Sequence, residues 1–325
     1  MKKVMKVFGI VVLCVIGVIA ALIGFIFIKN KIQMNKPVLP DDYYTYFHSD
    51  MPLEQSYAGR GTYEVSNVVY KNDDQAIENI RVWYPAQMEQ SGQKYPMILV
   101  VNASNTAALN YEPFFARLAS WGFIVVGNDD RQTGTGASAS TTLDQMLAWN
   151  AEQGSVFFEK IDDTKIGCIG YSQGGAGAIR AVTEFENSDK YTALFTGSAA
   201  YALLSNNLGW GYDAAKIQIP YFMTAGTGTS DDAGNSEIHN NKVFAGVAPL
   251  ASLEENYDHI SEDFYKVMAR VVGAEHQDML HMTDGYMTAW MLWQLCDDAQ
   301  AQSVFCGENA EINQNSGWQD IRKNG

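Results

Sequence analysis

The chain has 325 residues, with 22 lysines and arginines against 37 aspartates and glutamates, and 12% of its residues are aromatic. This length accommodates one large α/β domain with a full hydrophobic core plus a small appendage. The composition excludes a disordered or fibrous protein, and the lack of any repeat of fixed period argues against a solenoid.

The first 36 residues differ from the rest. Residues 7–28 carry no charge and follow a lysine-rich start. As a helix this run would measure roughly 33 Å, enough to cross a bilayer core of about 30 Å. It is longer than the apolar part of a cleavable signal peptide, so we expect residues 1–36 to form an N-terminal transmembrane helix and membrane anchor. A short tail before the run favours an extracytoplasmic catalytic domain, although lysines on both sides of the run balance each other.

The remainder of the chain is strongly acidic. Beyond position 36 there are 16 basic and 37 acidic residues, a net charge of −21. Such a surface repels phosphate backbones, so we expect no nucleic-acid partner. Cys296 and Cys306 could form a disulfide in an exported domain or could remain free thiols, and none of the four cysteines has metal-site spacing.

Residues 37–60 contain Pro37, Pro40 and several aspartates and tyrosines, and we interpret them as a linker before a domain over 61–325. Alternating apolar residues at 62–70 and 77–84 predict a hairpin. Apolar runs that predict buried strands then alternate with amphipathic stretches that predict helices, which favours a mostly parallel central sheet with helices on both faces. The strands are expected at 97–101, 123–127, 166–169, 220–225 and 267–272, and the helices at 111–121, 142–153, 174–186, 252–266 and 285–296.

The most specific motif is Gly-Tyr-Ser-Gln-Gly-Gly at 170–175, directly between a predicted strand and a predicted helix. This is the context of the G-x-S-x-G nucleophile elbow of the α/β-hydrolase fold. Two glycines allow a sharp turn that projects the Ser172 hydroxyl over the end of the sheet. The N-terminus of the following helix favours negative charge at the same place.

A serine hydroxyl needs a base, and the base needs an orienting carboxylate, in the chain order serine, acid, histidine. Of five histidines, His276 follows the last predicted strand and is the expected base, with His281 as the rival. The acid should follow the strand at 220–225, where Asp231 is our choice and Asp232 the alternative. Both carboxylates are suitably placed in the sequence.

Acyl transfer also requires donors for an oxyanion. One is expected from the backbone amide of Gln173, and the other from the loop after residues 97–101, where Ser104 is the candidate and Asn105 the alternative. The histidines lack H-E-x-x-H spacing, and Gly134-Thr135-Gly136 lacks the rest of a dinucleotide fingerprint. We therefore expect neither a metal nor a cofactor.

From Gly61 to Leu295 the chain resembles the dienelactone-hydrolase and cutinase-like branch of the α/β-hydrolases, which includes polyester hydrolases acting on polyethylene terephthalate. The stretches that carry the resemblance are 60–63, 115–123, 170–175 and 289–291. It implies a serine esterase with a shallow cleft and no cofactor. The chain departs from those enzymes at Gln173, where they have methionine, in Ala103-Ser104, where they have glycine and an aromatic residue, and at 195–199, which lacks their tryptophan.

These observations predict a serine hydrolase that cleaves carboxylic esters, small aryl or alkyl esters or polyesters, through a Ser-His-Asp triad and an acyl-enzyme. Two alternatives use the same fold. One is a membrane-surface acyltransferase, which would need an acceptor site that excludes water. The other is a non-catalytic binding protein, against which the complete Ser172, His276 and Asp231 or Asp232 set argues.

Overall fold

The computed structural model describes residue 29 and residues 34–325. The transmembrane helix expected over 7–28 lies outside these residues. Within the part of the chain that is described, no helix combines the length and the apolar character that crossing a bilayer demands.

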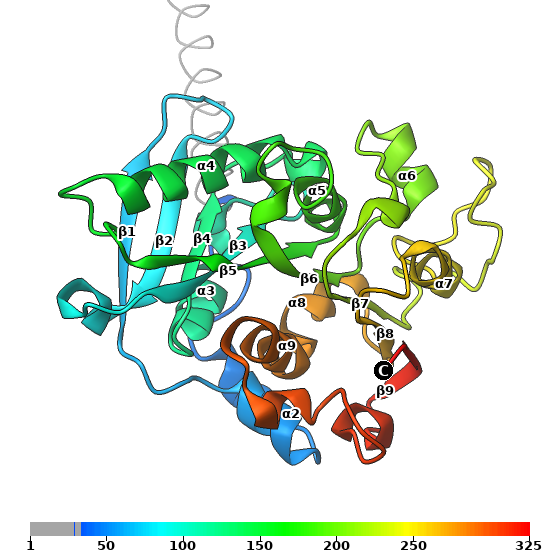
Figure 1. Ribbon diagram of the computed structural model, residues 1–325. Coiled ribbons are helices and arrows are strands. Elements are labelled where there is room, and N and C mark those ends of the chain that lie inside the picture. The colour runs from blue at the N-terminus through cyan, green and yellow to red at the C-terminus, as the bar shows by residue number, and fades with distance from the viewer. Residues whose placement is uncertain (1–28, 30–33) are drawn as a thin grey trace, which may run out of the picture.

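A nine-stranded sheet organises the molecule (Figure 1), in the order β1-β2-β4-β3-β5-β6-β7-β8-β9. The strands are β1 Val65–Lys71, β2 Asn79–Pro85, β3 Tyr95–Val101, β4 Ile124–Asn128, β5 Ile161–Tyr171, β6 Tyr191–Gly197, β7 Tyr221–Gly226, β8 Lys266–Val271 and β9 Trp318–Lys323. The central strands from β4 to β8 pair in parallel, whereas β1, β2 and β9 pair antiparallel at the two edges. The expected mostly parallel sheet is confirmed.

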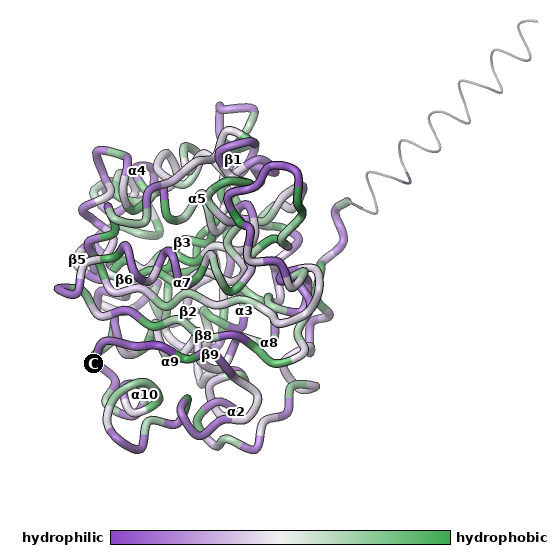
Figure 2. Tube along the Cα trace, turned by 90° about the vertical axis from the view of Figure 1, so that its right-hand side faces the viewer, coloured by the Kyte–Doolittle hydropathy of each residue, from purple (hydrophilic) through white to green (hydrophobic). Residues whose placement is uncertain are grey.

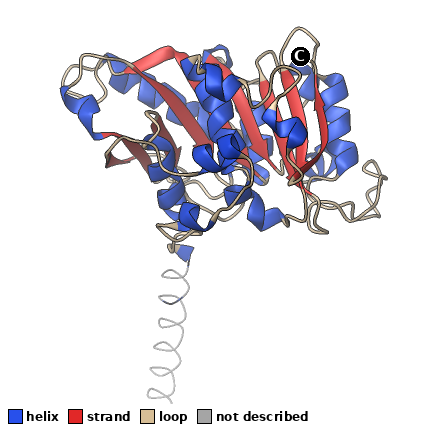
Figure 3. Cartoon of the chain, turned by 90° about the horizontal axis from the view of Figure 1, so that it is seen from below, coloured by secondary structure: helices blue, strands red, loops and turns tan. Residues whose placement is uncertain are grey.

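Helices cover both faces of this sheet (Figure 3). They are α2 Pro52–Ala58, α3 Glu112–Ala119, α4 Ala137–Ala151, α5 Gln173–Ala181, α6 Ala202–Asn207, α7 Leu250–His259, α8 Met279–Met282, α9 Asp284–Cys296 and α10 Ala299–Gln302. Because side chains alternate along a strand, Ile98 and Val100 belong to the core on the face that α3 and α9 cover, whereas Met97 and Leu99 belong to the core on the face that α4, α5 and α7 cover. Apolar stretches follow the inner strands and polar ones the outer loops (Figure 2).

The sequence-based elements differ from the structure at a few places. The helix expected at 252–266 ends at His259, because β8 already begins at Lys266. β9 was not predicted, since Trp318–Lys323 is mostly polar and pairs on one side only, at the sheet edge. Cys296 and Cys306 are free thiols.

The linker interpretation of residues 37–60 is wrong for most of this segment. Helix α2 packs against α9, and Tyr43 and Tyr57 are buried. A Cβ on Gly285 would lie 2.4 Å from the Glu54 carbonyl oxygen, so only glycine permits this approach of the two helices. Burial of these side chains makes the segment part of the folded domain.

A buried ionic cluster ties this segment to the helix layer. Arg117 Nη2 lies 2.8 Å from Asp284 Oδ1, and the Tyr43 hydroxyl donates to Asp284 Oδ2 at 2.6 Å. Arg117 Nε in turn donates to the Tyr43 oxygen at 2.9 Å. Burial raises the pKa of Asp284 to about 6, against the lowering effect of the Arg117 charge. The cluster joins α3, α9 and the N-terminal segment.

Candidate active site

Ser172 lies at the sharp turn between β5 and α5. Its φ of 57° and ψ of −123° place a non-glycine residue in a strained backbone conformation, which costs about 1–3 kcal/mol and is typical of functional sites. The neighbouring glycines permit the turn: a Cβ on Gly170 would lie 2.2 Å from the Gly174 carbonyl oxygen, and one on Gly174 would lie 2.2 Å from that of Val101. The predicted elbow therefore has the expected local structure.

The structure brings Ser172, His276 and Asp231 together. His276 Nε2 lies 2.9 Å from Ser172 Oγ, and His276 Nδ1 lies 2.6 Å from Asp231 Oδ1. The Asp231 carboxylate is fully buried, and its Oδ2 accepts hydrogen bonds from the Gly226 amide at 2.8 Å and from the Ser198 hydroxyl. A carboxylate held in this way fixes the orientation of the imidazole, so that one nitrogen faces the serine.

The rival residues lie elsewhere. Asp232 pairs with Arg270, whose Nη1 lies 2.5 Å from its Oδ2. His281 lies on the short helix α8, and burial lowers its pKa. Of the two neighbouring aspartates that the sequence left open, only Asp231 contacts the histidine.

A second set of contacts fixes the loop that carries the histidine. The Glu275 carboxylate accepts hydrogen bonds from the Ser230 amide at 3.0 Å and from the Ser230 hydroxyl, and these bonds lower the pKa of Glu275. The same hydroxyl oxygen accepts the His276 amide at 2.8 Å. Sequence reasoning missed Ser198, Ser230 and Glu275; their only signal is a position directly after a strand or beside a predicted site residue.

Two backbone amides near Ser172 remain free. Among the described residues, neither the Ser104 nor the Gln173 amide has a hydrogen-bond acceptor. The Asn105 amide instead donates to the Arg131 carbonyl at 2.9 Å, and the Ala103 amide donates to the Tyr111 hydroxyl at 3.2 Å. Because an oxyanion needs unoccupied donors, this favours Ser104 over Asn105.

Side-chain amides connect the nucleophile elbow at Gln173 with the loop after β3 that contains Ser104 and Asn105. Gln173 Nε2 donates to Gln132 Oε1 at 3.2 Å, and Gln132 Nε2 donates to Asn105 Oδ1 at 3.3 Å. The glutamine at 173, which replaces the methionine of the polyester hydrolases, thus gives the elbow a polar connection to the loop after β3. The sequence did not predict a role for Gln132.

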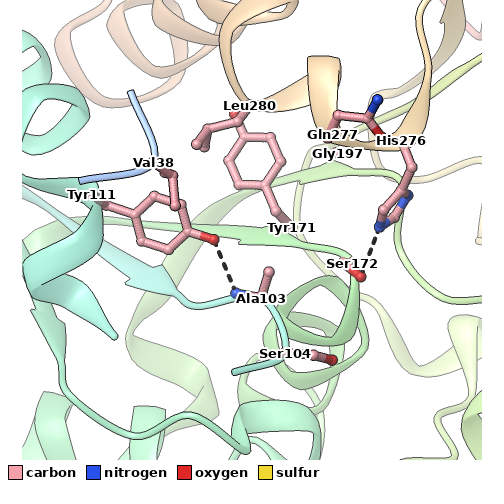
Figure 4. Close-up of a pocket in the computed structure, with 10 residues that line it drawn as sticks. All are labelled: Val38, Ala103, Ser104, Tyr111, Tyr171, Ser172, Gly197, His276, Gln277 and Leu280. Carbon is pink, nitrogen blue, oxygen red and sulfur yellow. Dashed lines mark hydrogen bonds between the residues drawn. The ribbon is translucent and has the colours of Figure 1, made fainter. Parts of the chain in front are cut away.

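A cavity of about 330 Å³ opens beside Ser172 (Figure 4). It is lined by Val38, Ala103, Ser104, Tyr111, Tyr171, Ser172, Gly197, His276, Gln277 and Leu280. None of these side chains is an acid, a lysine or an arginine. Burial raises the pKa of both Tyr111 and Tyr171, so both phenols stay neutral. The lining suits an uncharged, largely apolar group.

The described residues contain no group of three or more histidine, cysteine, aspartate or glutamate side chains arranged to hold a metal ion. Phe195, in the segment where the polyester hydrolases carry a tryptophan, is fully buried in the core. It therefore offers no aromatic surface to a bound substrate.

Comparison with known families adds one finding. Residues 50–196 match the family model PETase, described as PET hydrolase-like. This confirms the resemblance to the polyester-hydrolase branch of the α/β-hydrolases. No curated protein matches the chain. The matched region contains Ser172 and the donor loop but ends before Asp231 and His276, so the assignment of these two residues rests on the geometry alone.

Proposed function

We propose that this protein hydrolyses carboxylic esters through an acyl-enzyme on Ser172. The observation that carries the proposal is the hydrogen-bonded line from Asp231 through His276 to Ser172 Oγ, at the strained turn beside an apolar cavity. The match to a PET hydrolase-like family supports ester chemistry independently of that geometry.

In the proposed reaction His276 Nε2 takes the Ser172 proton while Oγ attacks the acyl carbonyl carbon. The carbonyl oxygen becomes an oxyanion, which the Ser104 and Gln173 amides would stabilise by donating hydrogen bonds. When the C–O bond to the alcohol breaks, His276 protonates the departing oxygen. A water molecule, deprotonated by the same nitrogen, then releases the acid and restores the serine hydroxyl.

The lining of the cavity supports one class of substrate. Without a cationic side chain in the lining, an acyl group that bears a carboxylate gains no ion pair there, so neutral acyl or aryl esters are favoured. Polyesters are compatible with an open cleft. The family's tryptophan has no counterpart at 195–199, so we expect short aliphatic esters to be better substrates than terephthalate esters.

The test is hydrolysis of p-nitrophenyl esters, from acetyl to dodecanoyl, by the full-length protein with Ser172→Ala alongside. We expect turnover by the wild type and its loss in the variant. Equal background rates for both proteins, with folding shown by circular dichroism, would refute the proposal.

We also propose that residues 1–36 hold this domain at a membrane surface, on the extracytoplasmic side. The support is the uncharged run at 7–28. Co-flotation of the full-length protein with vesicles, resistant to high salt and alkaline carbonate, is the expected result. Recovery of the protein in the soluble fraction would contradict the anchor.

A further inference from the structure

The segment that follows the uncharged run is fixed to the domain beside the candidate active site. We call residues Met34–Val38 the strap. Asn110 Nδ2 donates to the carbonyl oxygens of Met34 and Lys36, at 2.8 and 2.7 Å, and the Val38 amide donates to the Asn110 carbonyl at 2.8 Å. One asparagine thus holds the strap at three points along its length.

The strap also forms part of the cavity wall. Val38 lines the cavity together with Tyr111, the residue directly after Asn110, and the Val38 side chain is half exposed. Figure 4 shows Val38 beside Tyr111, across the opening from Ser172 and His276. The point where the N-terminal segment joins the domain is therefore the rim of the cavity.

The length of the connecting chain limits how far this rim can lie from a membrane. Five residues lie between Ile28, the last of the uncharged run, and Met34, so six Cα–Cα steps join the two. Fully extended, these six steps span at most about 21 Å. A domain of this size has a radius of gyration of about 19 Å and is roughly 50 Å across. An anchor at 7–28 therefore keeps the cavity rim on the half of the domain nearest the bilayer.

The charge of the domain restricts which lipids it meets. From the strap onward the chain carries a net charge of −20, with Lys36 as the one basic residue of the strap, and this overall charge repels anionic headgroups. The cavity lining itself carries no lysine or arginine that could pair with a phosphate. An apolar, uncharged opening near the bilayer suits the acyl chain of a neutral lipid.

We propose that the substrate is a neutral glycerol ester resident in the membrane, whose acyl group enters the cavity past Val38. The inference rests on the proposed ester hydrolysis and specifies its substrate. Ser172 would take the acyl group and release the glycerol hydroxyl, protonated by His276. Water would then release the fatty acid.

The experiment uses the full-length protein in vesicles of ether-linked phosphatidylcholine, which contains no ester of its own. A diacylglycerol with a fluorescent acyl chain is placed either in the same vesicles or in separate ones, and release of the fluorescent acid is measured. Because tethering raises the effective substrate concentration, we expect hydrolysis at least about tenfold faster when both share a vesicle. p-Nitrophenyl octanoate in solution monitors the chemistry itself.

Two insertion variants test the strap. Twenty Gly-Ser residues inserted between positions 33 and 34 should lower hydrolysis of the lipid by about threefold or more, because a long flexible tether no longer holds the rim near the bilayer. The same insertion between Asp73 and Asp74, in the exposed turn between β1 and β2, is the matched control. Both variants should hydrolyse the soluble ester at the wild-type rate.

The outcomes separate the two proposals. Hydrolysis of the soluble ester without hydrolysis of the shared-vesicle diacylglycerol would overturn the lipid substrate and leave esterase function intact. If phosphatidylglycerol, an anionic lipid, with the same fluorescent acyl chain were hydrolysed as fast as the diacylglycerol, the proposal of a neutral substrate would be overturned. Equal rates of lipid hydrolysis by the two insertion variants would overturn the role of the strap. Loss of both activities would refute the esterase itself.

Discussion

Two buried aspartates show how the same side chain serves different ends in this molecule. Asp231 and Asp284 are 0% and 1% exposed, and each has a basic partner within 2.8 Å. The partner of Asp284 is Arg117, whose side chain is fully buried. The partner of Asp231 is His276, whose side chain is 24% exposed and lines the cavity.

The difference between these sites lies in the partner. Arginine keeps its proton at any ordinary pH, so the Asp284 cluster can only hold helices together. A neutral imidazole has one donating and one accepting nitrogen, and it can pass a proton to and from a group in the cavity. Burial of an acid is therefore an indicator of function only when its partner can exchange a proton with a substrate.

The largest effect on activity is expected at His276, the partner of Asp231 that can exchange a proton with a substrate. His276→Ala should lower kcat/KM for p-nitrophenyl esters by at least about 10⁴-fold, because Ser172 loses its base. His281→Ala, on the neighbouring helix, is the matched control and should remain close to wild type. Steady-state kinetics on both proteins checks this, and comparable losses in the two variants would contradict the assignment.

The next largest effect is expected when Asp231 is replaced, and the same substitution at the adjacent Asp232 serves as its comparison. Asp231→Asn should cost about 10⁴-fold in kcat, because the amide no longer holds the imidazole in the required tautomer. Asp232→Asn should leave kcat nearly unchanged and lower stability by about 1 kcal/mol through its weakened pairing with Arg270. Kinetics combined with urea unfolding separates the two; a larger kinetic loss at Asp232 would reverse the choice of acid.

Substitutions in the buried ionic cluster of Arg117 and Asp284 should lower stability and leave catalysis unchanged. Arg117→Met leaves Asp284 buried without its cation, which should lower the free energy of unfolding by about 3–5 kcal/mol while kcat per folded molecule stays unchanged. The matched control is Lys165→Met, which removes a solvent-exposed pair with Asp297 and should cost less than about 1 kcal/mol. Denaturant titration measures both. Equal stability losses would show that burial of the pair adds nothing.

The smallest effect is expected at Gln132, which bridges the side chains of Gln173 and Asn105. Gln132→Ala removes hydrogen bonds to Gln173 and Asn105 and should lower kcat by about 2- to 10-fold with KM unchanged. Gln87→Ala, at an exposed position in the short 3-10 turn Ala86–Gln90 directly after β2, is the control. A change in KM alone would indicate that Gln132 affects binding rather than the transition state.

Much of this architecture could be predicted from the sequence. Buried strands such as 97–101 and the elbow at 170–175 are local patterns, so they carry their own signal. The order serine, acid, histidine then identified His276 by its position after the last predicted strand. The central sheet and the proposed site residues Ser172, Gln173 and His276 follow from these signals.

The remainder depends on contacts between distant segments. Nothing near Asp231 or Asp232 tells which of them meets His276; the structure separates them because Arg270, on β8, pairs with Asp232. The composition of 37–60 is typical of a linker, and the segment is folded because it packs against α9, more than 200 residues later. Ser198 has only its position directly after a strand as a signal, and Gln132 and the strap have no local pattern at all.

The most direct test of the central claim is covalent labelling of Ser172. A fluorophosphonate probe reacts only with a serine that a neighbouring base activates. Intact-mass and peptide analysis of the full-length protein should show one adduct, located on Ser172 and absent from Ser172→Ala and His276→Ala. An unlabelled wild type, or an adduct on another residue, would contradict the account.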